Sequence, residues 1–162
     1  MSDGFWDWAV AAYAAHGVAE ECLHLQDVHD QVVPLLLWAA WQAETGRKPD
    51  EDAIEGAVDT TRVWADHAVV PLRELRRALK TRRPDMADPD REAVRAQVKA
   101  VELEAERRLM LALEVLAPAP APGGKAPATV ELLVRVAREW GDQIPRPALG
   151  HLADALAKRL PA

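Results

Sequence analysis

The chain of 162 residues contains only one cysteine, Cys22, so it can form no internal disulfide and no zinc site built from several cysteines. It also lacks an apolar run of the roughly 20 residues that a membrane-spanning helix needs. The longest stretch without a charge covers residues 31–43. The first residues include Asp3 and Asp7, whereas a secretion signal would carry Lys or Arg there. These absences lead us to expect a cytoplasmic protein without a membrane span.

Phenylalanine and tyrosine are scarce, with one of each, although the chain has six tryptophans. Hydrophobic residues make up 49% and charged residues 28%, as in ordinary globular proteins. The net charge of -6 argues against a general binder of nucleic acids or anionic membranes. A chain of this length has room for about one domain with a full hydrophobic core.

Signals for β-strands are almost absent, because the alternation of apolar and polar residues never persists, whereas helical spacing recurs throughout. The sequence predicts an all-α protein with main helices at about 3–16, 19–28, 32–44, 50–81 and 88–116. Asp30 and Asp50 should cap the third and fourth of these. Pro71 should kink the fourth near residues 66–68, because it removes a backbone donor inside the helix.

The fourth and fifth helices should pair as a long antiparallel hairpin, because each has apolar residues at alternating spacings of four and three. These stripes are Ile54, Val58, Thr61, Ala65, Ala68, Leu72, Leu75 and Leu79 in one helix, and Val94, Val98, Val101, Ala105, Leu109, Ala112 or Leu113, and Leu116 in the other. The first three helices should cover this seam, with the nearly charge-free third helix at the centre. The expected result is a five-helix bundle over residues 1–117.

The last part of the chain has a different character. Residues 118–128 are rich in proline, alanine and glycine and predict a linker. Residues 129–162 predict a tail of two short helices. Such a tail is too small to be stable alone, so it should dock on the bundle or meet a partner.

The order of several segments resembles an uncharacterised bacterial family of proteins of unknown function, family 2390. The segments that carry the resemblance are FWDWAVAAYAAHGV from Phe5, CLHLQD from Cys22, VVPLLLWAAW from Val32, WADHAVVPLRELRRALK from Trp64 and ELEAERRL from Glu102. The resemblance covers about residues 5–116. It implies an all-helical cytoplasmic protein of unknown activity, and it supplies no catalytic residue.

A polar group near the apolar helices is one candidate site. Asp27 lies near a helix C-terminus, where a carboxylate opposes the helix dipole. It could form a structural tie to the backbone of the third helix or to Arg73 or Arg76. It could instead bind a small ligand in a pocket between the first four helices, and the residues of that hypothesis are His24, Gln26, Asp27, Trp38 and Trp64.

The sequence offers no complete metal or catalytic site. Glu21 and His24 have the spacing found in di-iron bundles, but such bundles need the motif twice and two further carboxylates. Cys22 has no accompanying oxyanion hole, and cysteine on an apolar helix face is commonly a core residue. We therefore expect no metal, no cofactor and no catalytic residue.

Basic residues crowd the end of the fourth helix, where they complement the helix dipole. Their number also fits a docking patch for a partner, although the absence of interleaved aromatic residues weakens the case for nucleic acid. An exposed Trp8 would mark a further contact surface. The residues of this patch hypothesis are Trp8, Arg73, Arg76, Arg77 and Lys80, with Arg82 and Arg83 next to them.

These observations favour a non-enzymatic helical interaction or regulatory protein, whose partner is another protein or a second copy of the chain. The alternative is a small-ligand-binding protein or an enzyme with a pocket near Gln26 and Asp27. A ligand that stabilises the wild type but not Asp27→Asn would support the alternative.

Overall fold

The computed structural model describes residues 4–123 and 127–160, and within these ranges the regular structure is helical, without strands. The all-α class predicted from the sequence is therefore confirmed. The helices are α1 (Phe5–Tyr13), α2 (Val18–His29), α3 (Val33–Glu44), α4 (Glu51–Trp64), α5 (Val70–Ala78), α6 (Asp88–Leu116), α7 (Thr129–Trp140) and α8 (Arg146–Lys158). Residues 3 and 124–126, which fall in the expected first helix and linker, lie outside the described ranges.

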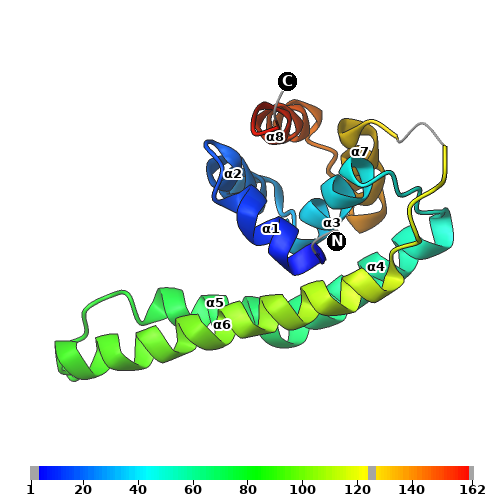
Figure 1. The fold of residues 1–162 in the computed structure, drawn as a ribbon. Coiled ribbons are helices and arrows are strands. Elements are labelled where there is room, and N and C mark those ends of the chain that lie inside the picture. The colour runs from blue at the N-terminus through cyan, green and yellow to red at the C-terminus, as the bar shows by residue number, and fades with distance from the viewer. Residues whose placement is uncertain (1–3, 124–126, 161–162) are drawn as a thin grey trace.

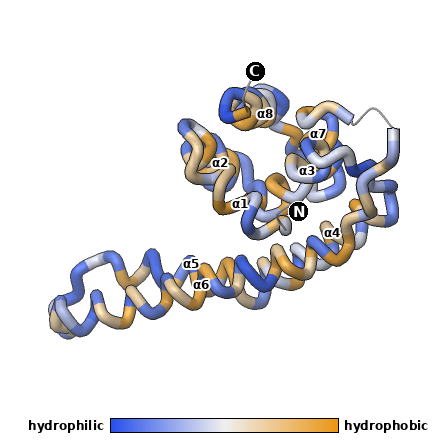
Figure 2. Tube along the Cα trace, viewed as in Figure 1, coloured by the Kyte–Doolittle hydropathy of each residue, from blue (hydrophilic) through white to orange (hydrophobic). Residues whose placement is uncertain are grey.

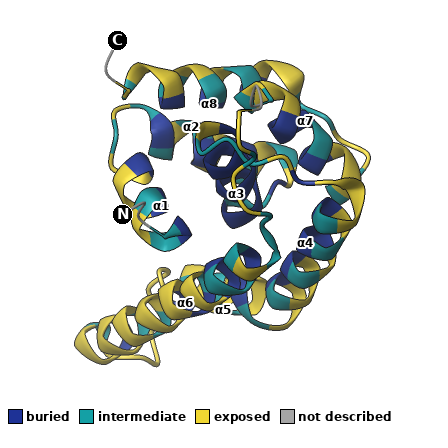
Figure 3. Cartoon of the chain, turned by 45° about the vertical axis from the view of Figure 1, so that its right-hand side comes forward, coloured by how far each residue is buried: buried dark blue, intermediate teal, exposed yellow. Residues whose placement is uncertain are grey.

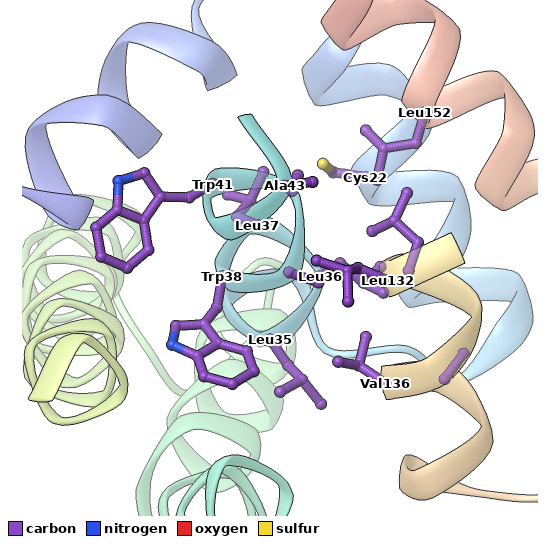
Figure 4. Packing of buried hydrophobic residues seen from close by; sticks show 14 of the residues in the cluster. Cys22, Leu35, Leu36, Leu37, Trp38, Trp41, Ala43, Leu132, Val136 and Leu152 are labelled. Carbon is purple, nitrogen blue, oxygen red and sulfur yellow. The ribbon is translucent and has the colours of Figure 1, made fainter. Parts of the chain in front are cut away.

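Helix α3 occupies the middle of the molecule, with α1, α2, α6 and α7 around it (Figure 1). All of its residues from Pro34 to Ala43 are buried. Trp38 and Trp41 extend from one side of α3, and Leu36 extends from the opposite side toward α7 (Figure 4). A helix without charges over most of its length cannot face water on any side without exposing apolar surface, which explains its central place.

The residues that end these helices differ in part from the expectation. The Asp50 side chain accepts a hydrogen bond of 2.8 Å from the backbone N–H of Ala53 and caps α4, as predicted. The prediction that Asp30 caps α3 was wrong, because Val32 holds that position. Asp30 instead ends α2 in the left-handed conformation, with φ of 54°. Asparagine and aspartate tolerate this conformation better than most residues do.

Helices α7 and α8 pack against the N-terminal helices, α7 on α3 and α8 on α2. Their fully buried residues include Leu132, Val136, Leu149 and Leu152, which belong to the same hydrophobic cluster as Trp38. Trp140 adds a hydrogen bond of 2.9 Å from its indole N–H to the carbonyl of Asp30. The two last helices thus dock on the rest of the chain, one of the two outcomes expected for the tail, and α7 encloses α3 together with the earlier helices.

The long hairpin is present, but it extends past the helices around α3 (Figures 1 and 3). Helix α4 passes through a π-helical turn at Ala65–Val69 into α5, at the place where an interruption was expected before Pro71. Helix α6 then returns over 29 residues. We call residues 70–106 the arm, the turn at 79–87 its tip, and the end next to the π-helical turn its base.

Candidate interaction site on the helical arm

One side of the arm is held together by ion pairs between α5 and α6. Arg73 and Arg76, one turn apart on α5, both bind the carboxylate of Glu102 on α6, with 3.3 Å between Arg73 Nε and Glu102 Oε1. The Glu102 side chain is only 9% exposed. A carboxylate that accepts bonds from two guanidinium groups can stay ionised in such a place.

A second carboxylate, Glu106, lies one turn further along α6. Arg73 reaches it as well, with 3.2 Å between Nη2 and Oε1. Burial raises the pKa of Glu106, and the charge of Arg73 opposes that shift. Burial also raises the pKa of Tyr13 on α1, and the negative charges of Glu106 and Asp27 raise it further. The ionic side of the arm therefore faces α1 and α2.

An exposed ion pair connects this side of the arm to α2. Arg77 Nη2 lies 3.1 Å from Asp27 Oδ1, and both side chains are more than half exposed. Gln26 donates a longer hydrogen bond of 3.4 Å to the same oxygen. Asp27 thus makes a structural tie to the arm, through Arg77 rather than through Arg73 or Arg76. We call the side of the arm that carries Arg73, Arg77 and Glu106 the inner flank.

The residues of the ligand hypothesis are not gathered around Asp27. Trp38 lies in the core, where its indole N–H donates a hydrogen bond of 2.8 Å to the carbonyl of Leu113. His24 is exposed and meets the edge of His29, with ring centres 5.2 Å apart. Trp64, at the end of α4, packs against the core. In the described part of the chain, no hydrogen bond or ion pair links these three residues to Asp27.

Two surface hollows lie elsewhere. One is lined by residues of α3 and α8, including Glu44 and Leu156. The other is lined by residues of α4 and α7, including Glu51 and Arg135. Neither hollow has His24, Gln26 or Asp27 in its wall.

The basic patch predicted at the end of the fourth helix is largely neutralised by acidic partners. Arg73, Arg76 and Arg77 are in the ion pairs described above, and Arg82 pairs with Asp88 at 2.8 Å. Lys80 is exposed and takes part in no ion pair of the described residues. The sequence could have indicated this pairing, because Arg73 and Arg76 on one helix and Glu102 and Glu106 on the other each share a face.

Trp8 lies away from this patch. It is partly buried, its indole N–H donates a hydrogen bond of 3.1 Å to Glu44, and the guanidinium of Arg159 lies 5.1 Å from its ring centre. Trp8 therefore helps to hold α1 against α3 and α8.

Cys22 is fully buried, and burial raises the pKa of its thiol to about 12. The thiol therefore stays protonated and is a poor nucleophile. Among the residues that the structure describes, no three or more His, Cys, Asp or Glu side chains are grouped so that they could hold a metal ion.

The opposite side of the arm, which we call the outer flank, is apolar. Leu75 is two residues from Arg77, and two residues correspond to about 200° around a helix, so Leu75 points away from the inner flank. Leu72 and Leu79 lie on the same side as Leu75. On α6, Val101 and Leu103 stand on either side of the buried Glu102, with Leu103 toward the inner flank. The outer flank is formed by Leu72, Leu75, Val94, Val98 and Val101, while Leu79 on the same side is buried.

This apolar stripe is part of the seam that the sequence predicted. The seam is buried at Leu79, Ala105 and Leu109, but several of its members in the arm lie at the surface. Leu75, Val94 and Val101 are 47%, 50% and 53% exposed. The buried positions of α6 in the arm are Arg91, Glu102 and Ala105.

The expectation that the first three helices cover the stripe holds for Ile54, Val58 and Leu109, which lie in the same buried cluster as α3. It was wrong for the arm, because α1 and α2 face the inner flank. Apolar residues of the arm remain on its surface (Figures 2 and 3).

A comparison with protein families gave a match, whereas no curated protein and no solved structure matched the chain. None of the described helices is long and apolar enough to cross a membrane. Tyr13, Asp27, Arg73 and Glu106, which meet at the inner flank, come from four different segments that carry the family resemblance. The chain belongs to the family of proteins of unknown function DUF2390, whose model matches residues 4–113.

Proposed function

We propose that this chain is a non-enzymatic helical interaction protein and that the outer flank of the arm binds another polypeptide. The observation that carries this proposal is the row of half-exposed apolar residues along the arm, with Leu75, Val94 and Val101 as its most exposed members. Apolar residues in a continuous row on a soluble protein commonly mark a binding surface. Side chains spaced by three and four residues suit the apolar face of a partner helix.

The distribution of side chains on the two sides of the arm supports the same proposal. A hairpin that served only to complete the core would place its apolar residues toward α1 and α2. Here the ion pairs of Arg73 with Glu106 and of Arg77 with Asp27 lie on that side, and Leu75, Val94 and Val101 lie on the other. The most exposed residues of the outer flank, Leu75, Val94 and Val101, take no part in these ion pairs and stay available to a partner.

Site-specific photo-cross-linking in cells tests this proposal. A photoreactive amino acid at Val101 should give covalent adducts with a polypeptide, because this residue lies on the outer flank. Leu103 provides a matched control, since it is 56% exposed on the same helix but lies toward the inner flank. Equal adduct yields from positions 101 and 103, or adducts from neither, would contradict the proposal.

The alternative of a small-ligand-binding protein or enzyme has less support. Asp27 is paired with the exposed Arg77, and Trp38 and Trp64 lie at other places in the fold. Its test is the shift in thermal unfolding midpoint of the wild type and of Asp27→Asn with a panel of metals, nucleotides and metabolites. A shift seen only for the wild type would favour a ligand site.

A further inference from the structure

We propose that the inner flank of the arm, in its half next to the tip, binds an acidic segment of another polypeptide. The carboxylates of that segment lie between Lys80, at the end of α5, and Lys99 of α6. Both lysines are exposed, and among the described residues neither takes part in an ion pair. The inference goes beyond the proposed function, because it concerns the other flank of the arm and depends on charge. Leu103 is four residues closer to the base than Lys99, so it lies outside the proposed contact.

The positions of the two lysines follow from an ion pair closer to the base. Arg73 of α5 contacts Glu106 of α6 at 3.2 Å. The two helices are antiparallel, so seven residues toward the tip lead to Lys80 on one side and Lys99 on the other, and a spacing of seven keeps the same face of a helix. The N–H of Lys80 still donates a hydrogen bond of 3.2 Å to the carbonyl of Arg77, so the coil of α5 extends this far. The base thus has a guanidinium opposite a carboxylate, whereas the tip has two ammonium groups opposite each other.

Two like charges that face each other repel, so this part of the arm is less stable than it is with an anion between them. Attraction to the dipole of α5 explains Lys80 at a helix C-terminus. It does not explain Lys99, which lies in the middle of α6. Glu102 is three residues from Lys99, but its carboxylate is bound by two guanidinium groups.

Other carboxylates of the inner flank are engaged as well. Asp27 of α2 lies 3.1 Å from Arg77. Glu92, seven residues from Lys99 on α6, lies 3.6 Å from Arg95. An anion between the two lysines therefore has to come from another molecule.

The setting of the two lysines favours the carboxylates of a polypeptide over the phosphates of a nucleic acid. The net charge of -6 repels a long polyanion. Residues 70–106 contain no Phe, Trp or Tyr on which bases could stack. A short acidic segment needs only a few cations, and exposed charges of this kind select a partner and its orientation.

Fluorescence anisotropy of a labelled peptide of about ten glutamates, titrated with the purified full chain in about 50 mM salt, tests the proposal. We expect a dissociation constant below about 100 µM, and no binding of the matched glutamine peptide. The double variant Lys80→Gln/Lys99→Gln should raise the dissociation constant by about tenfold or more.

The matched control is Lys48→Gln/Lys158→Gln, which removes the same charge from exposed positions outside the arm. It should leave the dissociation constant within about twofold of wild type. Equal weakening by the two double variants, or a wild type that does not bind the glutamate peptide, would overturn the proposal. A DNA strand of about ten nucleotides that binds more tightly than the peptide would overturn the choice of a polypeptide.

The single variant Lys99→Glu separates binding from stability. It places a carboxylate opposite Lys80, as Glu106 lies opposite Arg73, and should raise the unfolding midpoint by about 1–2 °C. It should also abolish binding of the glutamate peptide. A lower midpoint would show that the two lysines do not face each other and would contradict the proposal. If position 101 gives adducts in cells while the peptide does not bind, the proposed function stands and the acidic contact fails.

Discussion

The helices around α3 and the arm use apolar residues in opposite ways. Around α3 the largest side chains are fully buried, as for Trp38, and the apolar residues form one continuous cluster. In the arm the buried positions of α6 are Arg91, Glu102 and the small Ala105, while Val94 and Val101 are half exposed. The largest side chains of the first region are therefore covered by its own helices, whereas the apolar residues along the outer flank of the arm are covered only in part.

This difference shows how two neighbouring parts of one chain can be stabilised by different interactions. Burial of apolar surface is the main stabilising contribution in the core. Ion pairs of partly buried groups contribute less on balance, because the cost of removing charges from water offsets much of their attraction. Such pairs connect the two helices of the arm, and Leu75, Val94 and Val101 stay at its surface. Four predictions test this comparison.

The largest effect is expected at the centre of the core. Trp38→Ala removes a fully buried indole and its hydrogen bond to the carbonyl of Leu113, and it should lower the free energy of unfolding by about 3–5 kcal/mol. Urea denaturation followed by circular dichroism measures this change. Val115→Ala, at an 84% exposed position, should change it by less than about 0.5 kcal/mol. A loss below about 1 kcal/mol for Trp38→Ala would show that α3 is not the centre of stability.

The second largest effect is expected at the ion pairs between α5 and α6. Glu102→Ala leaves Arg73 and Arg76 without their shared partner in a partly buried place, and we expect a loss of about 2 kcal/mol. Glu104→Ala is the control on the same helix, because its pairs with Arg107 and Arg108 are exposed, and it should cost less than about 0.5 kcal/mol. Equal losses in the free energy of unfolding of the two variants would argue against a structural role for the ion pairs of Glu102.

A smaller, pH-dependent effect is expected at Glu106. Its raised pKa means that the folded protein holds this proton more tightly than the unfolded chain does, so unfolding releases it. The contribution of Glu106 to stability is therefore present below its ordinary pKa of 4.5 and is lost as the pH rises through the folded pKa. Glu106→Gln should remove this contribution. Urea unfolding of both proteins across that pH range should show a shallower decline for the variant, and a steeper decline would contradict the assignment.

The smallest effect is expected at the contact between the arm and α2. Asp27 and Arg77 are both more than half exposed, so water and salt screen their attraction. Asp27→Asn should change the free energy of unfolding by less than about 0.5 kcal/mol. A loss above about 1.5 kcal/mol would mean that this pair fixes the arm to the core more firmly than its exposure indicates.

The arm also shows where reasoning from the sequence failed. On α6 two rows of residues have the same helical spacing and lie side by side, one with Val94 and Val101 and the other with Arg91 and Glu102. The hydrophobic row is the natural choice for a seam, and the sequence analysis chose it. The structure buries the other row because Arg73 and Arg76 supply partners for Glu102. Two basic residues on one helix and acidic residues on its partner were the signal that could have corrected the choice.

The sequence by itself determined the helical class, the cap at Asp50, the interruption before Pro71 and the burial of α3. Each of these depends on spacing or residue type within a few turns of one helix, so the local chain contains the information. Only the tertiary structure decided which flank of the arm faces α1 and α2, and that α7 covers α3. These choices depend on contacts between residues far apart in the chain, and the periodicity of one helix is the same whichever neighbour covers it.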